Sequence, residues 1–566
     1  MSHRPYNHAQ DAPPDTVPNT TLPRPGTLIL LVLALAVVWF SNLEYRKLID
    51  PDEGRYAEIP REMVASGNWV TPRLDGFKYF EKPPLQYWAT AAAYEAFGVH
   101  HWTARLWPAL TGALGIALVF FAGRTLFGVT AGYCAALVLA GSVAYPVTAH
   151  VNALDSGLTF FMALALCALM LALRDGATPR GNRAWMLVAW AAMALAVLSK
   201  GLIGIVLPGA ILAIYIVLQG DWGILRRLQL MLGTLTFAAI AVPWFWLVQR
   251  ANPEFFDFFF IHEHFERYLT AVHSRVKPWW FFLVILAVGI LPWIVTLCDA
   301  PLRAWRSESG RAGFRPRRFL LIWAAFILVF FSLSHSKLPS YTLPMFPALA
   351  LLLGERLDQL VPRDLRWHLL PLPILGAVLL GVAAFLPQLA DARMPVEMYR
   401  DYMPWLYAAG AIGVAGGIYA LFENHRGRIV AAVTAAGFCG LVITQLLVTG
   451  FDSFSPARSS YHVVSKIESQ LRPDLPFYSV GLYDQTLPFY LKRTVTLVLF
   501  RGELDMGIKS DPQLWLPDLD AFRKIWREQH EAMAIVHPAY YDELAASGLP
   551  MRVIARDTRR VIVKAP

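Results

Sequence analysis

Long apolar runs separated by short polar segments recur along most of this chain. The first, GTLILLVLALAVVWF at 26–40, contains no charged residue. A transmembrane helix needs about 20 largely apolar residues to cross the hydrocarbon core of a bilayer. Because similar runs recur as far as residue 449, the first run is not a cleaved signal peptide. The pattern therefore predicts a polytopic α-helical membrane protein.

The length of these runs predicts about 13 transmembrane helices. We expect them at 27–43, 104–123, 129–147, 154–173, 184–199, 202–219, 229–249, 279–298, 319–333, 340–354, 369–387, 403–422 and 429–449. Arginines gather in alternate loops, for example at 174–183, 303–318 and 356–366. Loops rich in Arg and Lys stay in the cytoplasm. The N-terminus is therefore expected inside and the C-terminal end outside.

Three regions follow from this pattern. Residues 1–26 are polar and rich in proline, which is typical of a disordered cytoplasmic tail. Residues 27–450 form the transmembrane domain, with long outer loops at 44–103 and 250–278. In the first of these loops, 56–66 and 84–97 are expected as amphipathic helices on the membrane surface. Tyr79, Tyr87 and Trp88 are expected there as interfacial aromatic residues.

After about residue 453 the continuous apolar runs give way to short alternating elements. Strands are expected at 477–481, 495–500, 532–537, 552–556 and 560–564, and helices at 462–471, 518–530 and 539–547. Residues 451–566 are therefore predicted to form an outer α/β domain. This region has neither GxGxxG nor a P-loop sequence, so nothing in it indicates nucleotide binding.

Composition excludes some classes of function. The chain is 56% hydrophobic and 16% charged, with a formal net charge of +9. Most of the excess is arginine in the cytoplasmic loops, so the charge does not indicate nucleic-acid binding. The four cysteines lie in separate apolar runs without a CxxC sequence, which is typical of core residues rather than of disulfides or metal ligands.

Charged and tyrosine side chains cluster in the outer loops. The first loop carries PDEGRYAEIPREM at 51–63, and ionisable residues at a membrane surface usually mark a site. The candidates are Asp52, Arg55, Tyr56, Tyr79, Glu81, Lys82, Asp155, Lys200, His262, Arg267, Lys337 and Tyr341. The alternative is that each is an ordinary interfacial residue, which is equally favoured for Lys337 and Arg267. Their recurrence in nearly every outer turn favours one shared cavity.

The residue types indicate the chemistry of the ligand. Cations and tyrosines in a cavity open to lipid suit a phosphate on a long apolar chain. Carboxylates there suit the hydroxyls or amine of a sugar, so the combination indicates a polyprenyl-phosphate sugar. Glu81 and His262 could also bind a divalent ion such as zinc. A structural salt bridge of Glu81 is equally favoured, and no cofactor is required.

Three motifs carry a resemblance to a known family: DEGRYAEIPREM, FEKPPLQYW and SKLPSYTLPMFPALA. They resemble the GT-C membrane glycosyltransferases, and within them the ArnT family of bacterial 4-amino-4-deoxy-L-arabinose lipid A transferases, which are related to protein O-mannosyltransferases. The resemblance implies an inner-membrane enzyme with a periplasmic active site. Its donor would be the aminosugar on undecaprenyl phosphate and its acceptor a phosphate group of lipid A, which confers polymyxin resistance. We expect a monomer in contact with membrane lipids.

The resemblance also implies roles for the candidate residues. Asp52 matches the acidic residue of the family's first loop, and Glu81 with Lys82 matches its second motif. We expect Asp52, Asp155 and Glu81 to be catalytic and the remaining cations and tyrosines to bind substrate. Lys82 and Arg267 would hold the donor phosphate, and a one-step displacement would invert the anomeric centre.

Two alternatives stay open at this point. One is a GT-C enzyme that transfers mannose or galacturonic acid from a polyprenyl phosphate, since its carboxylates would be the same. The other is a lipid transporter or flippase. Transporters carry charges near the bilayer midplane and often show internal repeats, whereas these charges lie at one face and no repeat is apparent.

Overall fold

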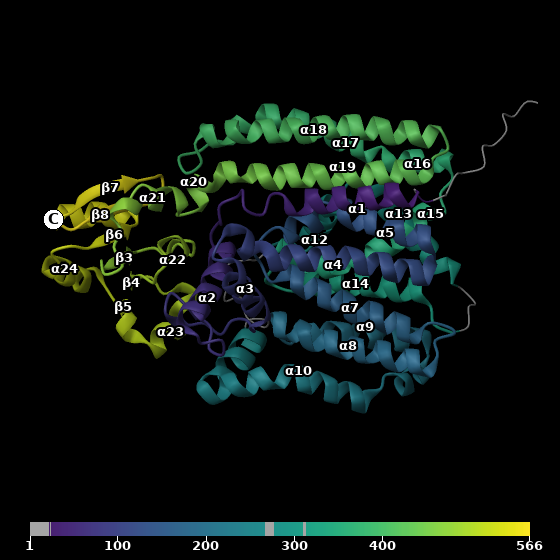
Figure 1. The fold of residues 1–566 in the computed structure, drawn as a ribbon, viewed down its shortest axis with the longest axis horizontal. Helices are drawn as coiled ribbons and strands as arrows, with labels where there is room; N and C mark the ends of the chain where they lie inside the picture. The colour runs from purple at the N-terminus through teal and green to yellow at the C-terminus, as the bar shows by residue number, and fades with distance from the viewer. Residues whose placement is uncertain (1–21, 23, 267–276, 309–312) are drawn as a thin grey trace, which may run out of the picture.

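The computed structural model describes residues 22, 24–266, 277–308 and 313–566. A bundle of long helices and a smaller α/β part, which holds the C-terminus, lie end to end along the long axis (Figure 1). Within the described residues, eight helical segments are long and apolar enough to cross a membrane. They are α4 (His101–Phe127), α7 (Asp155–Leu173), α8 (Pro179–Lys200), α10 (Leu230–Ala251), α14 (Pro316–Leu333), Pro362–Leu389 with α16 (Pro362–Leu369) and α17 (Pro371–Phe385), α18 (Val396–His425), and Ile429–Arg458 with α19 (Ile429–Gly450).

The other predicted spans are shorter or broken. The segment expected at 279–298 consists of α12 (Phe281–Gly289) and α13 (Ile294–Ser307), which are bent by 107° at a break that contains Pro292. The segment expected at 340–354 begins as a 3-10 turn, η3 (Pro339–Met345), and is α-helical only in α15 (Phe346–Asp358). Proline has no N–H to donate, which disfavours a continuous helix at both places.

Three further apolar helices have only 10–17 residues: α1 (Pro25–Phe40), α5 (Val129–Gly141) and α9 (Ile203–Gln219). The predicted spans thus all coincide with helical segments. Among the described residues, however, only eight of these segments, or nine if the bent pair is one span, meet the length requirement by themselves.

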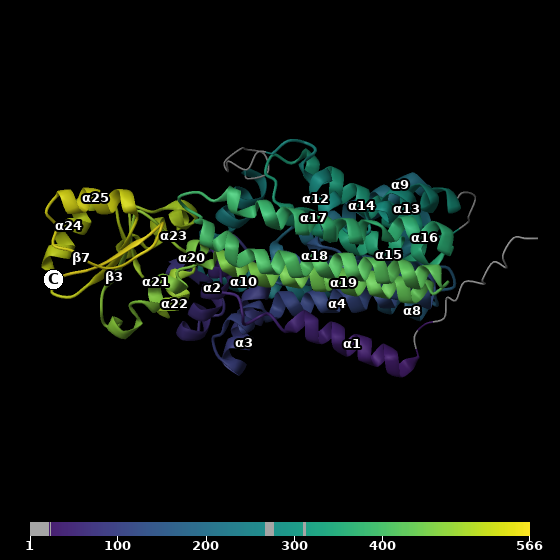
Figure 2. The ribbon, with the colours of Figure 1, turned by 90° about the horizontal axis from the view of Figure 1, so that it is seen from above.

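Helices α17, α18 and α19 form a row along one side of the bundle, with α10 on the opposite side (Figures 1 and 2). Small residues allow this row to pack closely. A Cβ atom added to Gly376 of α17 would lie 2.4 Å from the backbone nitrogen of Val414 in α18. Close backbone approach at small residues is typical of helix packing in membranes.

The first outer loop folds into α2 (Asp52–Ser66), β1 (Arg73–Leu74), β2 (Phe77–Lys78) and α3 (Leu85–Phe97). The two expected helices are present, but the surface location predicted for the first of them is wrong. Most of α2 is buried, from Glu53 to Pro60 without a break, and Tyr79 and Tyr87 are also buried rather than interfacial. Packing against the C-terminal part covers this loop, which a local pattern cannot reveal.

The C-terminal part contains a six-stranded sheet with the order β5-β4-β3-β6-β8-β7. Its strands are β3 (Phe477–Val480), β4 (Thr496–Val498), β5 (Trp515–Leu516), β6 (Met533–Val536), β7 (Arg552–Arg556) and β8 (Val561–Lys564). Strands β3 to β6 pair in parallel, whereas β6, β8 and β7 pair antiparallel. Its helices are α20 (Ser455–Arg458), α21 (Tyr461–Ser465), α22 (Leu487–Leu491), α23 (Asp505–Ser510), α24 (Leu519–Glu528) and α25 (Pro538–Ala546). The five predicted strands are confirmed, and β5 was missed.

Both faces of this sheet are buried. Tyr478 of β3 packs with Phe522 and Trp526 of α24 on one side. The opposite face carries Phe477, which belongs to a cluster that also contains Ile59 and Phe77 of the first outer loop. Successive side chains of a strand point to opposite faces, so β3 connects the two cores. The sheet is thereby fixed against the loop that carries Asp52.

A charged cavity at the outer end of the bundle

A cavity of about 740 Å³ lies where the first outer loop, the helix bundle and the C-terminal part meet. Its lining comes from α2, the Glu81–Lys82 segment, the start of α7, the end of α8, η3 and the region around α23. The charged and tyrosine residues that line it are Asp52, Arg55, Tyr56, Glu81, Lys82, Asp155, Lys200, Tyr341, Glu503, Asp505 and Lys509, together with His262. Nine of the twelve candidate residues line this one cavity.

A buried ion pair fixes the position of α2. Arg105 of α4 binds Glu53 through two contacts, Nε to Oε1 at 2.7 Å and Nη2 to Oε2 at 2.8 Å, and both side chains are fully buried. Burial alone would raise the pKa of Glu53, but Arg105 outweighs it and lowers that pKa to about 2. Glu53 is therefore ionised and anchors the start of the helix, directly beside Asp52.

Gly54 allows a second close contact of α2. A Cβ atom at this position would lie 2.5 Å from the backbone carbon of Gln485, in the segment before α22. Only glycine permits this approach of two backbones. The start of α2 is therefore held between α4 and the C-terminal part, and the side chain of Asp52, at the first position of α2, is 49% exposed toward the cavity.

Arg55 joins two carboxylates across the cavity. Its Nη1 lies 3.2 Å from Oδ1 of Asp52, and its Nη2 lies 3.0 Å from Oε1 of Glu503. Burial lowers the pKa of Arg55, but Tyr79 and Glu503 outweigh it and hold that pKa above its ordinary value. The guanidinium also lies over the rings of Tyr56 and Tyr79, at 5.8 and 5.9 Å from their centroids. Arg55 is thus a fixed cation that orients Asp52.

Lys200 and Asp155 form the second ion pair of the cavity. Lys200 is the last residue of α8 and Asp155 the first of α7, and Nζ lies 2.5 Å from Oδ1. Their side chains are 16% and 13% exposed, and Nζ lies 5.3 Å from the ring centroid of Tyr341. Two long apolar helices thus bring opposite charges to the same outer edge of the bundle.

Glu81 and Lys82 enter the cavity from the segment between β2 and α3. Lys82 donates from Nζ to the carbonyl of Glu81 at 2.7 Å. His262, from the π-helical segment η2 (Asp257–Glu266), lines the same cavity. No group of three histidine, cysteine or acidic side chains suited to a metal ion occurs among the described residues. An ion held by Glu81 and His262 would therefore need a further ligand from water or substrate.

Two of the described candidate residues do not line the cavity. Tyr79 is buried beneath it, where its ring contacts Arg55. Lys337 is buried and donates from Nζ to the carbonyl of Ser334 at 2.5 Å, which indicates a structural role at the base of η3. Arg267 lies outside the described residues.

The C-terminal part supplies charges that the sequence analysis did not single out. Glu503, Asp505 and Lys509 line the cavity from η7 (Gly502–Leu504) and α23. Gln485 donates to Oε1 of Glu503 at 2.8 Å and so helps to hold it against Arg55. A signal was present in RGELDMGIK at 501–509, a charged run directly after a buried strand.

An apolar wall adjoins these charges. A buried cluster adjoins the cavity and comes from the first loop, α8, α10, the segment before η2 and η2 itself: Phe80, Leu198, Trp244, Val248, Phe255 and Phe259. Phe258 of η2 lines the cavity itself and packs partly buried against this cluster. Fixed cations beside an aromatic wall suit an amphiphile with a phosphate and a long apolar chain. The carboxylates suit a cationic or hydroxylated group on the same ligand.

Comparisons with known proteins agree with this chemistry. Residues 26–259 match the family model described as dolichyl-phosphate-mannose-protein mannosyltransferase, and residues 463–565 match the aminoarabinose transferase C-terminal domain. An undecaprenyl phosphate-α-4-amino-4-deoxy-L-arabinose arabinosyl transferase of Pseudomonas aeruginosa is 35% identical over 91% of this chain and 93% of its own length. One from Pseudomonas fluorescens is 33% identical, but the alignment spans 63% of this chain and 60% of that protein.

A solved structure also resembles the whole chain. The crystal structure of ArnT from Cupriavidus metallidurans bound to undecaprenyl phosphate is 39% identical, with a TM-score of 0.91. The alignment covers 96% of this chain and 98% of that one. Both the helix bundle and the C-terminal sheet are therefore shared.

Proposed function

The chain belongs to the family of undecaprenyl phosphate-4-amino-4-deoxy-L-arabinose arabinosyl transferases, and on this premise we propose that it transfers the aminosugar to a phosphate group of lipid A. The protein is a multi-pass membrane glycosyltransferase with a GT-C fold. Its donor is the sugar linked to undecaprenyl phosphate. The reaction would take place at the periplasmic face of the inner membrane and would confer resistance to polymyxin.

The observation that carries the proposal is the pairing of cations and carboxylates in one cavity beside an aromatic wall. Lys82 would hold the donor phosphate while the polyprenyl chain lies along the cluster that contains Phe80 and Phe255. We assign Arg267 to the same phosphate from the sequence alone. A lysine ammonium and an arginine guanidinium together neutralise the charge that grows on the leaving phosphate.

The chemical step needs no strong acid or base. An oxygen of the lipid A phosphate attacks the anomeric carbon, the bond from that carbon to the undecaprenyl phosphate oxygen breaks, and undecaprenyl phosphate leaves as an anion. The acceptor phosphate is already ionised at neutral pH, so proton abstraction is a minor requirement. Attack opposite the leaving group inverts the anomeric centre.

Within this step Asp52 has an electrostatic and orienting role. Arg55 holds its carboxylate through Oδ1 at 3.2 Å, and about half of the Asp52 side chain is open to the cavity. A fixed carboxylate there stabilises positive charge that develops on the sugar ring in the transition state. The 4-amino group of the sugar would pair with Glu81, or with Asp155 in competition with Lys200.

A divalent ion is a separate part of the proposal. Glu81 and His262 would supply two ligands, and phosphate oxygens of the substrate would complete the coordination of a zinc ion. The ion would add positive charge near the leaving phosphate. Since the reaction already has protein cations for this purpose, we do not expect the ion to be required.

Mass spectrometry of lipid A tests the proposed function. A Gram-negative host without its own transferase, but able to make the donor, should gain one 4-amino-4-deoxy-L-arabinose group per modified phosphate when it expresses this chain. A host that expresses the Asp52→Asn variant at the same level should not. Unmodified lipid A with the wild-type chain, or modification with a different sugar, would contradict the assignment.

A further inference from the structure

A second charged region lies where the C-terminal sheet meets the turn between α17 and α18. Two cavities, of about 380 and 260 Å³, share Arg393 and Arg559 in their linings. The larger is also lined by Asp484, His537 and Arg560, and the smaller by Asp50 and Arg458. Neither cavity shares a lining residue with the one that contains Asp52.

Two stiff turns present these arginines. Asp391 accepts from the backbone N–H groups of Arg393 and Met394 at 2.8 and 2.7 Å, which fixes the turn before α18. Asp557 does the same for Arg559 and Arg560, both at 2.8 Å, in the turn between β7 and β8. Side chains that bond backbone groups two or three residues on stabilise such turns. The arginine backbones are therefore preorganised.

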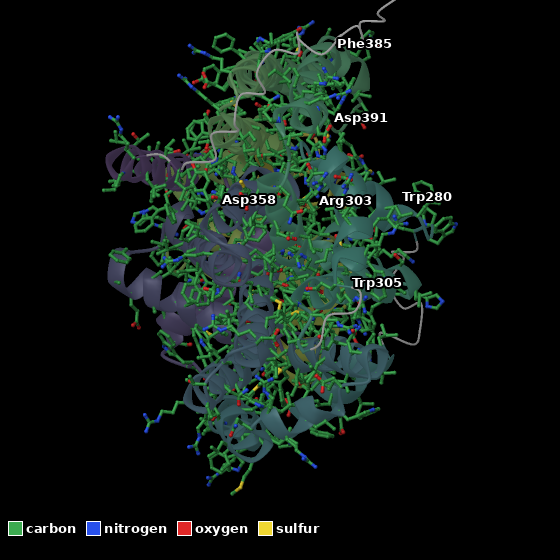
Figure 3. The ribbon with its side chains drawn as sticks, turned by 90° about the vertical axis from the view of Figure 1, so that its right-hand side faces the viewer. Trp280, Arg303, Trp305, Asp358, Phe385 and Asp391 are labelled. Carbon is green, nitrogen blue, oxygen red and sulfur yellow. The ribbon has the colours of Figure 1, made fainter. Side chains whose placement is uncertain are left out.

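The two turns are in contact with each other. The hydroxyl of Thr558 donates to the carbonyl of Arg393 at 3.3 Å. Figure 1 shows the start of α18 at the end of the bundle that adjoins the C-terminal part, and Figure 3 shows Phe385 and Asp391 of the α17–α18 hairpin at one edge of the bundle. Phe385 is 65% exposed at the end of α17, as expected for a side chain at the lipid boundary. The turn that carries Arg393 therefore directly follows the end of an apolar segment long enough to span a membrane.

In the lining of the smaller cavity, arginines outnumber carboxylates. Asp50 binds two arginines, with Oδ1 2.8 Å from Nε of Arg458 and Oδ2 3.0 Å from Nη1 of Arg559. Both guanidiniums are still more than a third exposed, and Arg393 beside them is also exposed. One carboxylate thus faces three arginines, which leaves charge and guanidinium donors for another anion.

A fourth arginine, Arg560, lies buried beneath the other three. Arg560 is buried and binds Asp484 at 2.5 Å and Asp557 at 2.9 Å. Asp484 follows β3 and His537 follows β6, the two parallel strands between which the chain reverses its direction across the sheet. The carboxyl ends of strands at such a point form a crevice in which α/β sheets commonly bind ligands. Arg560 is therefore structural, and Arg393, Arg458 and Arg559 are the side chains available to a ligand.

The region is also close to the catalytic cavity. Asp50 and Asp52 are two residues apart at the turn into α2, so their Cα atoms are at most about 7 Å apart. Asp50 contacts Arg458 and Arg559, whereas Asp52 lines the catalytic cavity. An acceptor with two separate phosphate groups could therefore reach both places at once.

We propose that Arg393, Arg458 and Arg559 bind a phosphate group of the lipid A acceptor while its other phosphate reacts beside Asp52. This inference rests on the proposed function, because it takes lipid A as the acceptor. The second phosphate thereby positions the first, and the site favours a diphosphorylated acceptor over a monophosphorylated one.

Transfer kinetics with the two acceptors test this inference. The wild-type enzyme should show a KM for diphosphoryl lipid A about tenfold below that for monophosphoryl lipid A, with similar kcat. Arg393→Ala should raise the first KM about tenfold and leave the second unchanged, so that the preference disappears. Arg400→Ala is the matched control, because Arg400 is exposed in the first turns of α18, close in sequence to Arg393, but lines neither cavity. An Arg393→Ala enzyme that keeps the wild-type preference would overturn the inference.

A second measurement separates this inference from the proposed function. Native mass spectrometry of the purified protein counts bound diphosphoryl lipid A whether or not transfer occurs. Weaker binding by Arg393→Ala but not by Arg400→Ala supports the site even if the wild-type chain transfers no sugar to lipid A. Equal binding by all three proteins contradicts it. Competition by inorganic phosphate, or equally by phosphatidylglycerol, would assign the arginines to phosphate groups in general and contradict a role specific to lipid A.

Discussion

Lys200 at the end of α8 contacts Asp155 at the start of α7, with 2.5 Å between Nζ and Oδ1. The two helices are connected on the opposite side of the bundle, so this pair closes their outer ends. Removal of one partner from a poorly exposed ion pair leaves an uncompensated charge. We expect Lys200→Met and Asp155→Asn each to lower the free energy of unfolding by about 2–4 kcal/mol.

A double-mutant cycle checks this prediction. The double variant should lose at least about 1 kcal/mol less than the sum of the two single variants. Unfolding in detergent, followed by tryptophan fluorescence, provides the free energies. Strict additivity would show that the two side chains act independently, and would leave both free to bind substrate.

Asp52 is expected to act in the reaction and not in folding. Its side chain is half exposed, whereas the neighbouring Glu53 provides the buried anchor to Arg105. Asp52→Asn should therefore reduce transfer at least about a hundredfold, as loss of one group that stabilises transition-state charge does. Its expression and thermal stability should match the wild type. Near-normal lipid A modification by a well-expressed Asp52→Asn variant would remove Asp52 from the reaction.

Donor binding should depend on a different set of residues. Lys82 is held beside Glu81 and followed by two prolines, which restrict the backbone that presents its charge. Lys82→Ala and Arg267→Ala should each weaken undecaprenyl phosphate binding about ten- to hundredfold, the effect of one lost charge-assisted contact. Asp52→Asn should bind it normally. Undecaprenyl phosphate binding to the purified variants in detergent measures these effects. Weak binding by Asp52→Asn together with normal binding by Lys82→Ala and Arg267→Ala would exchange the assigned roles.

The metal proposal predicts a limited effect of chelation. If Glu81 and His262 bind zinc, purified protein should contain it in a ratio near one, and His262→Ala should lower that ratio. Because Lys82 and Arg267 already provide positive charge, EDTA should reduce transfer by less than about tenfold. Metal analysis by mass spectrometry and transfer assays after chelation measure both effects. Full loss of activity with EDTA and recovery with zinc would make the ion essential.

The contact between α2 and the turn that connects β1 and β2 should depend on pH. Burial, and then the charge of Glu58, raise the pKa of Glu62 to about 8, although Arg61 and the backbone N–H groups of Asp75 and Gly76 act in the opposite direction. The carboxyl is thus protonated in the folded protein at neutral pH and would ionise on unfolding. The stabilisation is complete below the ordinary pKa of 4.5 and is lost as the pH rises through about 8.

Thermal unfolding at several pH values tests this effect. The wild-type stability should fall between about pH 5 and 8 with a slope of at most about 1.4 kcal/mol per unit. Glu62→Gln keeps the shape and cannot ionise, so its stability should change less over this range. A wild-type slope retained by Glu62→Gln would assign the dependence to Glu58 or Asp75, which lie in the same buried cluster.

Topology is predicted from the arginine-rich loops and agrees with the placement of α2 beside the C-terminal sheet (Figure 1). Cysteines at Asp52, His262 and the exposed Asp520 should react with an impermeant thiol reagent in intact spheroplasts, whereas cysteines at Arg315 and Arg426 should not. The background needs Cys298→Ser, because Cys298 is the exposed one of the four native thiols. Labelling of Arg315→Cys but not of Asp520→Cys would reverse the orientation.

The sequence by itself determined the elements and the residue types of the site. Apolar runs of sufficient length predicted the membrane helices, and alternating patterns predicted strands such as β3 and β6, because both follow from local periodicity. The charges of the outer loops were also visible, since a membrane chain carries few charges there without a reason. Whether each apolar run forms one unbroken helix was harder to predict. Pro292 and the prolines of η3 interrupt segments that hydropathy alone predicts as single spans.

Only the tertiary structure decided which of these charges share a cavity and which are structural. Glu503 reaches Arg55 from 448 positions further along the chain, and Lys337 is turned away to the carbonyl of Ser334. The first outer loop appeared to lie on the membrane, yet α2 is buried because the sheet face that carries Phe477 covers it. Such contacts depend on long-range packing, which leaves no periodic signal in the sequence. The residues proposed to react were therefore predictable from the sequence, but the partners that hold them in place were not.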